Sequence, residues 1–279
     1  MSLNSLAQRL AVCSWSLQPE NPTQLIQLLR AVGLNRIQLA LDPLRENPVL
    51  WGATGELCRA AGISLVSGMF GTVGEDYSTL DSIRRTGGLV PDHTWDENWE
   101  NAQATAEIAS NVGLTLVTLH AGFLPHEESD PEFEKLQHRI RLVADLFASK
   151  SIDVALETGQ ETASCLRVFV EKLGRPNVGV NFDPANLLLY DKGDPIAALR
   201  TLGPWVKQCH IKDAQRTRTP GLWGDEVVAG GGQVDWSQFF AELQRISFAG
   251  WCCIEREAGT RRVEDIVAAR KMVESLQQI

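Results

Sequence analysis

Five short apolar segments, which lie between residues 115 and 255, each end in a residue that can bind a metal ion or transfer a proton. These residues are His120, Glu157, Asp183, His210 and Glu255. If the last four meet, three carboxylates and one imidazole repel one another unless a cation neutralises them. Three oxygen donors and one nitrogen donor suit a hard or borderline divalent ion. We therefore predict one divalent ion at these four residues, with Mn²⁺ favoured over Mg²⁺, Zn²⁺ or Co²⁺.

The segments that carry these residues alternate with amphipathic segments along the whole chain. We predict strands at 11–16, 36–41, 63–69, 115–120, 152–157, 178–183, 206–210 and 251–255. Most are near-continuous apolar runs, which are typical of parallel strands covered on both faces. Apolar residues at three- and four-residue steps predict helices at 22–32, 98–112, 131–149, 162–173, 195–202, 236–246 and 263–276.

This alternation predicts an α/β fold, a single (β/α)8 TIM barrel formed by one domain over residues 1–279. In such a barrel the carboxyl ends of the strands converge on the catalytic face. A doubly wound open sheet is the alternative, but the glycine motif of dinucleotide-binding sheets does not follow the first predicted strand. The connections after strands 3 and 7, at 70–98 and 214–235, are much longer than the rest, and we expect them to wall the active site.

The composition restricts the partners and the compartment. The 279 residues include 26 Lys and Arg against 35 Asp and Glu, a formal charge of −9, which disfavours nucleic-acid binding by bulk electrostatics. The apolar stretches are shorter than the ~18 residues that a membrane span needs. The six cysteines form no C-x-x-C pair, and the first residues do not resemble a signal peptide. We expect free thiols in a cytoplasmic protein that binds neither nucleic acid nor membrane, with homo-oligomer formation left open.

Five motifs, in order and at barrel spacing, resemble the xylose isomerase-like family of TIM barrels. This family of sugar phosphate isomerases and epimerases belongs to a superfamily shared with endonuclease IV-type AP endonucleases. The resemblance covers nearly the whole chain. The motifs are Ala155-Leu-Glu157, Asn181-Phe-Asp-Pro-Ala-Asn186, His210-Ile-Lys-Asp213, Gly230-Gly-Gly-Gln-Val-Asp-Trp236 and Ile254-Glu255.

The resemblance implies roles for individual residues. In epimerases of the family the residues at the positions of Glu157, Asp183, His210 and Glu255 hold one divalent ion. The two glutamates also act there as the acid–base pair. Arg216, six residues after the histidine, is implied to hold substrate oxygens. Many members have a histidine where this chain has Asn186, which can hydrogen-bond a substrate hydroxyl but cannot titrate.

Three further residues complete the predicted substrate-binding set. Trp15 lies near the end of the first predicted strand, where an aromatic ring can stack on a sugar or close a lid. Lys212 follows the predicted metal-binding histidine closely enough to reach a substrate oxygen. His120 is expected beside the site as a hydrogen-bonding residue rather than a ligand. The neighbouring Asp213 is expected to pair locally, and the glycines at 230–232 to form a flexible loop return rather than a phosphate cradle.

These observations favour a divalent-metal-dependent isomerase or epimerase. It would act on a small sugar, sugar phosphate or hydroxy-ketone through an enediolate. A metal-dependent sugar-acid dehydratase of the same family would use the same ligands and remains an alternative. A zinc endonuclease is disfavoured because the chain has only five histidines, and a non-catalytic sugar-binding barrel is the remaining alternative.

Overall fold

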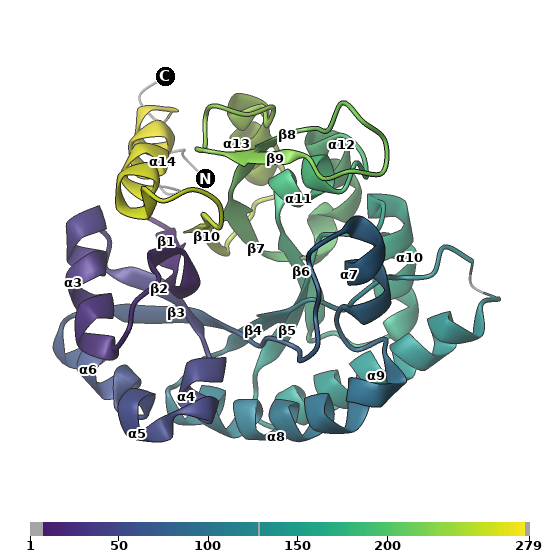
Figure 1. Ribbon diagram of the computed structural model, residues 1–279, viewed down its shortest axis with the longest axis horizontal. Coiled ribbons are helices and arrows are strands. Elements are labelled where there is room, and N and C mark those ends of the chain that lie inside the picture. The colour runs from purple at the N-terminus through teal and green to yellow at the C-terminus, as the bar shows by residue number, and fades with distance from the viewer. Residues whose placement is uncertain (1–7, 128, 277–279) are drawn as a thin grey trace.

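A computed structural model describes residues 8–127 and 129–276 of the chain. Eight parallel strands close into a barrel in the order β1-β10-β7-β6-β5-β4-β3-β2, with helices around it (Figure 1). The barrel strands are β1 (Leu10–Cys13), β2 (Arg36–Ala40), β3 (Ser64–Met69), β4 (Leu116–Leu119), β5 (Asp153–Glu157), β6 (Val178–Phe182), β7 (Val206–Ile211) and β10 (Trp251–Ile254). The predicted (β/α)8 barrel is confirmed.

The long helices lie where the apolar periodicity predicts them, to within three residues at each end. They are α3 (Pro22–Val32), α8 (Trp95–Asn111), α9 (Pro131–Ala148), α10 (Ala163–Leu173), α12 (Pro195–Leu202), α13 (Trp236–Arg245) and α14 (Arg262–Leu276). Between β2 and β3 the chain forms three short helices to which the sequence analysis assigned no range: α4 (Asp42–Glu46), α5 (Pro48–Trp51) and α6 (Thr54–Ala60). Asn47 caps α5 and Pro48 is its first residue, so no single long helical period could develop there.

Several predicted strands end one or more residues earlier than expected, and after β1 and β6 a helix begins directly. After β1, residues Ser14–Leu17 form the short helix α2, so the predicted strand end at 16 is wrong. After β6, Asp183 is the N-cap of α11 (Pro184–Leu189), and its Oδ1 accepts hydrogen bonds from the Ala185 and Asn186 amides. A capping side chain satisfies amides at a helix start, so Asp183 belongs to the helix as well as to the strand end.

The two long connections contain regular structure. Residues 70–94 include α7 (Leu80–Thr86) and the 3₁₀ turn η1 (Asp92–Thr94). Residues 212–235 include an antiparallel hairpin of β8 (Asp213–Gln215) and β9 (Asp225–Val227). A second 3₁₀ turn, η2 (Gly203–Trp205), leads into β7.

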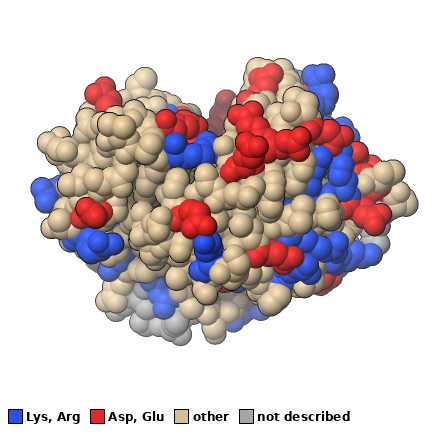
Figure 2. All heavy atoms as spheres, turned by 90° about the horizontal axis from the view of Figure 1, so that it is seen from below, with Lys and Arg blue, Asp and Glu red and all other residues tan. Residues whose placement is uncertain are grey.

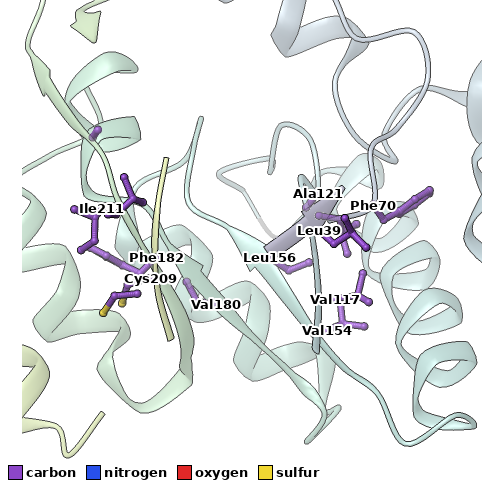
Figure 3. Close-up of a cluster of buried hydrophobic side chains, with 14 of the residues drawn as sticks. Leu39, Phe70, Val117, Ala121, Val154, Leu156, Val180, Phe182, Cys209 and Ile211 are labelled. Carbon is purple, nitrogen blue, oxygen red and sulfur yellow. The ribbon is translucent and has the colours of Figure 1, made fainter. Parts of the chain in front are cut away.

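The apolar core lies between the strands and the helices, and we call it the outer shell. Successive strand residues point to opposite faces, so alternate residues of each barrel strand face this layer. Figure 3 shows members of it on neighbouring strands: Val154 and Leu156 of β5, Val180 and Phe182 of β6, and Cys209 and Ile211 of β7. Full burial of one such large side chain contributes ~1.5–3 kcal/mol, so this layer contributes strongly to the stability of the barrel.

The inside of the barrel, which we call the lumen, is largely polar. Its fully buried polar residues are Gln38, Ser67, Thr118, Asn181 and Gln208. They form hydrogen bonds across the lumen: Gln38 Nε2 donates to Thr118 Oγ1 at 2.8 Å, and Ser67 Oγ donates to Gln208 Oε1 at 2.6 Å. Gln208 Nε2 in turn donates to Asn181 Oδ1 at 3.3 Å. A small apolar cluster fills the remaining space: Ala11, Cys13, Val66 and Cys253.

The surface mixes the two signs of charge. On the face in Figure 2, Lys and Arg side chains lie among Asp and Glu, and acidic side chains flank the hollow at its upper edge. The six cysteines are free, and all but Cys165 are buried. Among the described residues, no helix combines the length and the apolar character needed to cross a membrane.

Candidate metal centre and active site

The four predicted metal-binding residues meet at one end of the barrel. Glu157 ends β5, Asp183 follows β6, His210 lies in β7 and Glu255 follows β10. Each offers one ligand atom, and these four atoms lie within 4.8 Å of one another. His210 Nδ1 is the common neighbour, at 3.5 Å from Glu157 Oε1, 3.5 Å from Asp183 Oδ2 and 3.2 Å from Glu255 Oε2. All four residues are buried, so water does not screen their charges well.

The lumen fixes the orientation of the His210 ring. Nε2 lies 3.0 Å from Gln38 Oε1, and Gln38 turns this oxygen to the ring because its amide nitrogen donates to Thr118. An amide oxygen only accepts, so the network assigns the imidazole hydrogen to Nε2 and the lone pair to Nδ1. The Asn181 amide nitrogen is also 3.0 Å from Nε2, but it donates to Glu157 Oε2 at the same distance. His210 thus presents an acceptor to the three carboxylates.

Two buried atoms in this group have no hydrogen-bond partner. They are Asp183 Oδ2 and His210 Nδ1, and both face the other two carboxylates. Buried polar atoms are nearly always paired, so two unpaired acceptors side by side need a cation or a proton between them. The donor set of three carboxylate oxygens and one imidazole nitrogen fits a divalent ion. Cys13 is also close to His210, but burial raises the pKa of its thiol well above the usual value, which makes it a poor ligand.

Neutral amides hold the Glu157 carboxylate. Asn181 Nδ2 donates to Oε2 at 3.0 Å, and Asn186 Nδ2 donates to Oε1 at 3.1 Å. The Asn186 amide also donates to the Thr158 carbonyl oxygen at 3.0 Å, which ties it to the start of the β5–α10 connection. Each oxygen of Glu157 keeps a further lone pair for an ion or a proton.

A charged group holds the Glu255 carboxylate. Lys212 Nζ donates to Oε2 at 2.9 Å, and the indole nitrogen of Trp15 donates to Oε1 at 2.8 Å. The same ammonium group also donates to Glu257 Oε2 and lies 3.5 Å from Asn186 Oδ1. Lys212 therefore joins a predicted metal ligand to a carboxylate that lies at the cavity wall.

The charges at the site favour a positive charge at its centre. Burial is the largest single influence and opposes ionisation, but the carboxylates of Glu255 and Glu157 hold the pKa of His210 well above its usual value. Burial also opposes ionisation of Asp183 and therefore raises the pKa of its carboxyl group. The pKa of Glu255 nevertheless falls well below its usual value, because His210 and Lys212 outweigh the effect of burial. Without an ion, a proton on His210 Nδ1 supplies the charge, so a metal ion and a proton compete for one place.

A cavity of about 700 Å³ lies over this group. Four predicted substrate-binding residues line it: Trp15, His120, Asn186 and Lys212. Its apolar and aromatic wall is formed by Trp15, Met69, Leu189, Tyr190 and Trp223. A polar floor under an aromatic wall is suited to a small ligand that has both apolar and hydrogen-bonding faces.

Arg216 does not line this cavity. Its guanidinium group forms an ion pair with Asp191 and donates to the Gly193 carbonyl oxygen at 2.6 Å. Contact with a substrate would require the side chain to leave Asp191, so its role as a substrate ligand stays a prediction. Of the other aromatic residues on the long connections, Phe70 is fully buried in the outer shell, and Trp95 packs against that shell.

Asp213 pairs locally, as predicted. Its Oδ2 accepts from the Gly230 and Gly232 amides at 2.9 and 3.1 Å, and from the Trp236 indole nitrogen at 3.0 Å. Its Oδ1 accepts from the Val234 amide. The glycine-rich segment thus turns two amides towards a carboxylate, which leaves them unavailable to a phosphate group.

Residues that position the site were missed by the sequence analysis. Gln38 and Asn181 hold His210 and Glu157, and the signal for them was an amide inside an otherwise apolar strand segment. Glu75 and Glu257 also line the cavity. They lie in connections without a local pattern, so nothing in the sequence marked them.

Comparison with known proteins identifies the family to which the chain belongs. The model of the family described as xylose isomerase-like TIM barrel matches residues 26–278. A curated relative, the 3-dehydroshikimate dehydratase of Bacillus anthracis, is 33% identical over 90 residues, which are 30% of this chain and 31% of the relative. The chain therefore matches only about a third of the length of this relative.

Three of the solved structures that resemble most of the chain illustrate the similarity. The xylose isomerase domain protein from Planctomyces limnophilus has a TM-score of 0.84 and 32% identity, with 91% of this chain and 92% of that chain covered. A xylose isomerase-like TIM barrel protein from Mycobacterium smegmatis, solved in complex with magnesium, has a TM-score of 0.74 at 16% identity (99% and 98% covered). D-psicose 3-epimerase from Clostridium cellulolyticum H10, solved with D-tagatose, has a TM-score of 0.70 at 15% identity (97% and 98% covered). The last two share the fold, while the family match extends over most of the sequence: the chain belongs to the xylose isomerase-like TIM barrel family.

Proposed function

We propose that the protein is a divalent-metal-dependent isomerase or epimerase of a small sugar, sugar phosphate or hydroxy-ketone. The observation that carries this proposal is the pair of glutamates, Glu157 and Glu255, on either side of His210 Nδ1 at the floor of the cavity. The epimerases that share this fold, which act on D-psicose and L-ribulose, support the same class of reaction.

The ion would be held by Glu157, Asp183, His210 and Glu255. Their O₃N donor set favours Mn²⁺, with Mg²⁺, Zn²⁺ and Co²⁺ as alternatives. When bound, the ion supplies Lewis acidity that polarises a substrate carbonyl and its neighbouring hydroxyl and so acidifies the C–H bond between them.

The two glutamates move the proton. One carboxylate oxygen takes the proton from the substrate carbon, which gives an enediolate, and the other glutamate returns a proton to the opposite face or to the neighbouring carbon. Their partners differ: Lys212 donates a charged hydrogen bond to Glu255, whereas only neutral amides donate to Glu157. A charged donor stabilises the carboxylate more strongly and reduces its basicity, so Glu157 is the better base for the first step.

The remaining residues orient the substrate. Asn186 and His120 line the same cavity as Glu157 and would contact substrate hydroxyls. Trp15, Tyr190 and Trp223 offer aromatic faces for the apolar side of a sugar. Closure of such a wall around the substrate excludes water from the enediolate.

The proposal is tested by solvent exchange during turnover. Metal-free protein is loaded with Mn²⁺ and incubated with ketoses and their phosphates in D₂O, and deuterium at the carbon beside the carbonyl is measured by NMR. We expect deuterium incorporation that requires the ion and is lost in Glu157→Gln and Glu255→Gln. Near-normal activity in both variants would assign the two glutamates a purely structural role and overturn the proposal.

A dehydratase is the second candidate, because the curated relative that matches 90 residues is a 3-dehydroshikimate dehydratase. The same residues would remove a proton and then allow a neighbouring hydroxyl to leave as water. Mass spectrometry of the product separates the two reactions. An isomer has the mass of the substrate, whereas a dehydration product is lighter by one water.

A further inference from the structure

We propose that the cavity selects an uncharged polyhydroxylated substrate over phosphorylated or carboxylated ones, and that Glu75 is a determinant of this selection. The inference rests on the proposed function, because it concerns the substrate of the same site. It depends on which charges line the cavity and on which of them are already paired.

Acidic side chains predominate in the cavity wall. Five carboxylates line it: Asp42, Glu75, Glu157, Glu226 and Glu257. Among the described residues that line it, Lys212 is the only lysine or arginine. Its ammonium group already donates to Glu255 and Glu257 and lies near Asn186 Oδ1, which uses its three hydrogen atoms. A phosphate or carboxylate group would therefore find no free lysine or arginine side chain among the described residues of this wall.

Two of the lining carboxylates are neutralised from outside the cavity. Arg45 pairs with Asp42 at 3.0 Å, and Arg256 pairs with Glu226 at 2.8 Å. These arginines are directed to their carboxylates and do not line the cavity. They reduce the negative charge of the wall but offer nothing to a bound anion.

Glu75 differs because its hydrogen-bond partners Thr72, Tyr77 and Gly88 are neutral. Its Oε1 accepts from Thr72 Oγ1 at 2.8 Å and from the Gly88 amide at 2.9 Å, and the Tyr77 hydroxyl donates to Oε2 at 3.0 Å. Gly88 has a φ of +68°, and a Cβ there would lie 2.1 Å from the Gly122 nitrogen. Only glycine fits, so the amide that holds Glu75 belongs to a tightly constrained backbone. The carboxylate is fixed, charged and half-buried at the cavity wall.

The net charge around the cavity stays negative when a divalent ion is bound. Asp183 and Glu255 lie beneath the cavity, which brings the carboxylates of the region to seven. Three cationic side chains pair with them: Arg45, Lys212 and Arg256. The two positive charges of a divalent ion do not balance the excess of carboxylates over cationic side chains. A phosphate dianion would therefore enter a region of like charge. Carboxylate oxygens accept hydrogen bonds from hydroxyl groups, so the same wall attracts a neutral polyol.

A second cavity, beyond Tyr190, has cationic side chains that could bind an anion. A separate cavity of about 340 Å³ is lined by Arg84 and Lys192, and it shares Tyr190 with the main cavity. An elongated substrate could place a distal phosphate there while its carbonyl reaches the metal site. The experiment must therefore distinguish a phosphate near the reacting carbons from one at the far end.

The test compares kcat/KM for D-psicose, D-tagatose and D-fructose with that for D-fructose 1-phosphate and 6-phosphate, on Mn²⁺-loaded protein. We expect at least a tenfold preference for an uncharged ketose. Glu75→Gln, which keeps the shape but removes the charge, should narrow the preference by about tenfold. Tyr77→Phe removes a hydrogen bond to Glu75 but keeps its charge and should leave the preference in place. Glu97→Gln, at an exposed glutamate of α8, is the matched control.

Other outcomes overturn the proposal in distinct ways. A preference for the 6-phosphate that disappears in Arg84→Gln or Lys192→Gln would assign anion binding to the outer cavity. An unchanged preference in folded Glu75→Gln would remove Glu75 as a determinant. If that variant does not fold, the wild-type protein is measured at increasing salt concentration. Added salt should reduce its preference for uncharged ketoses if charge repulsion causes that preference.

If no ketose or phosphate reacts, the proposed function fails, and binding alone then tests the inference. Thermal-shift titrations with sorbitol and sorbitol 6-phosphate measure selectivity without turnover. Stabilisation of the metal-loaded protein by sorbitol supports the inference, and stronger stabilisation by the phosphate overturns it.

Discussion

The outer shell and the lumen are built from alternate residues of the same strands, yet they are held together in different ways. In β7, Cys209 and Ile211 pack in the shell, while His210 between them lies at the candidate metal centre. In β5, Leu156 packs outwards and Glu157 points to the same centre. Shell contacts are apolar and have no preferred direction, whereas the lumen is joined by hydrogen bonds whose geometry is directional.

This difference separates stability from site geometry. Loss of an apolar group in the shell lowers the free energy of unfolding but leaves the lumen amides in place. Loss of an amide in the lumen removes a partner of His210 or Glu157, so its effect should appear in ion affinity. The following experiments test this separation.

The largest effect should come from the residues where the lumen ends at the cavity. Glu157→Gln and Glu255→Gln should each lower turnover by about 10²–10⁴-fold, because one basic oxygen is lost while one ligand oxygen remains. Turnover and bound metal are measured together, with Glu97→Gln as the control. A fall in turnover that only follows metal loss would contradict the acid–base role.

A large loss of stability should come from the shell. Phe169 is fully buried in α10 and packs edge-on against Phe133 at a ring distance of 5.4 Å. Phe169→Ala should lower the free energy of unfolding by about 3–5 kcal/mol while the folded fraction keeps its Mn²⁺ affinity. Leu57→Ala, at a residue 40% exposed, should change the free energy of unfolding by about 0.5 kcal/mol or less. Denaturant titration measures the free energy of unfolding, and calorimetry measures the Mn²⁺ affinity.

A lumen variant should show the opposite pattern. Gln38→Leu removes the acceptor that holds Nε2 of His210, so Mn²⁺ affinity should fall by about 10–100-fold. Gln103→Leu, at an exposed glutamine of α8, is the matched control. Unchanged affinity in Gln38→Leu would mean that the lumen does not set the ring orientation.

Ion binding should weaken as the pH falls. The carboxylates hold the pKa of His210 well above its usual value against the effect of burial, so the ion-free site binds a proton more tightly than a free histidine does. This proton stabilises the ion-free fold below the unfolded histidine pKa of about 6.5, and the contribution is lost as the pH rises through the folded pKa. Mn²⁺ must displace it, so affinity should rise up to about tenfold per pH unit below that folded pKa. Calorimetry in buffers of different ionisation enthalpy should detect the released proton; its absence would contradict the competition.

The smallest effect should come from Arg216, which belongs to neither region. Its ion pair with Asp191 places it outside the cavity. Arg216→Ala should raise KM severalfold with metal content unchanged, if the side chain turns to the substrate when it binds. Arg218→Ala, at an exposed residue of the same connection, is the control. Full activity in Arg216→Ala would remove the substrate role that the family resemblance implies.

The sequence predicts those parts of the molecule that depend on local pattern and on the symmetry of the barrel. The four strand-end residues could be brought together in advance because parallel strands in a barrel all end at one face. The pairing of Arg216 with Asp191 joins positions 25 residues apart and leaves no local signal. The lumen amides were visible as polar residues in apolar segments, but their partners, such as Gln38 with Thr118, depend on the register of the closed barrel. Glu75 lies in a connection whose path only tertiary contacts determine.

The glycine-rich segment at 230–232 is held in place by Asp213, whereas its composition led us to expect a flexible loop return. The Asp213 carboxylate accepts the amides of Gly230, Gly232 and Val234, and a Cβ on Gly232 would lie 2.1 Å from Asp213 Oδ1. These glycines permit close approach to a carboxylate rather than motion. Hydrogen–deuterium exchange at Gly230 and Gly232 should therefore be slow for surface amides, since they are released only when the β8–β9 hairpin opens locally.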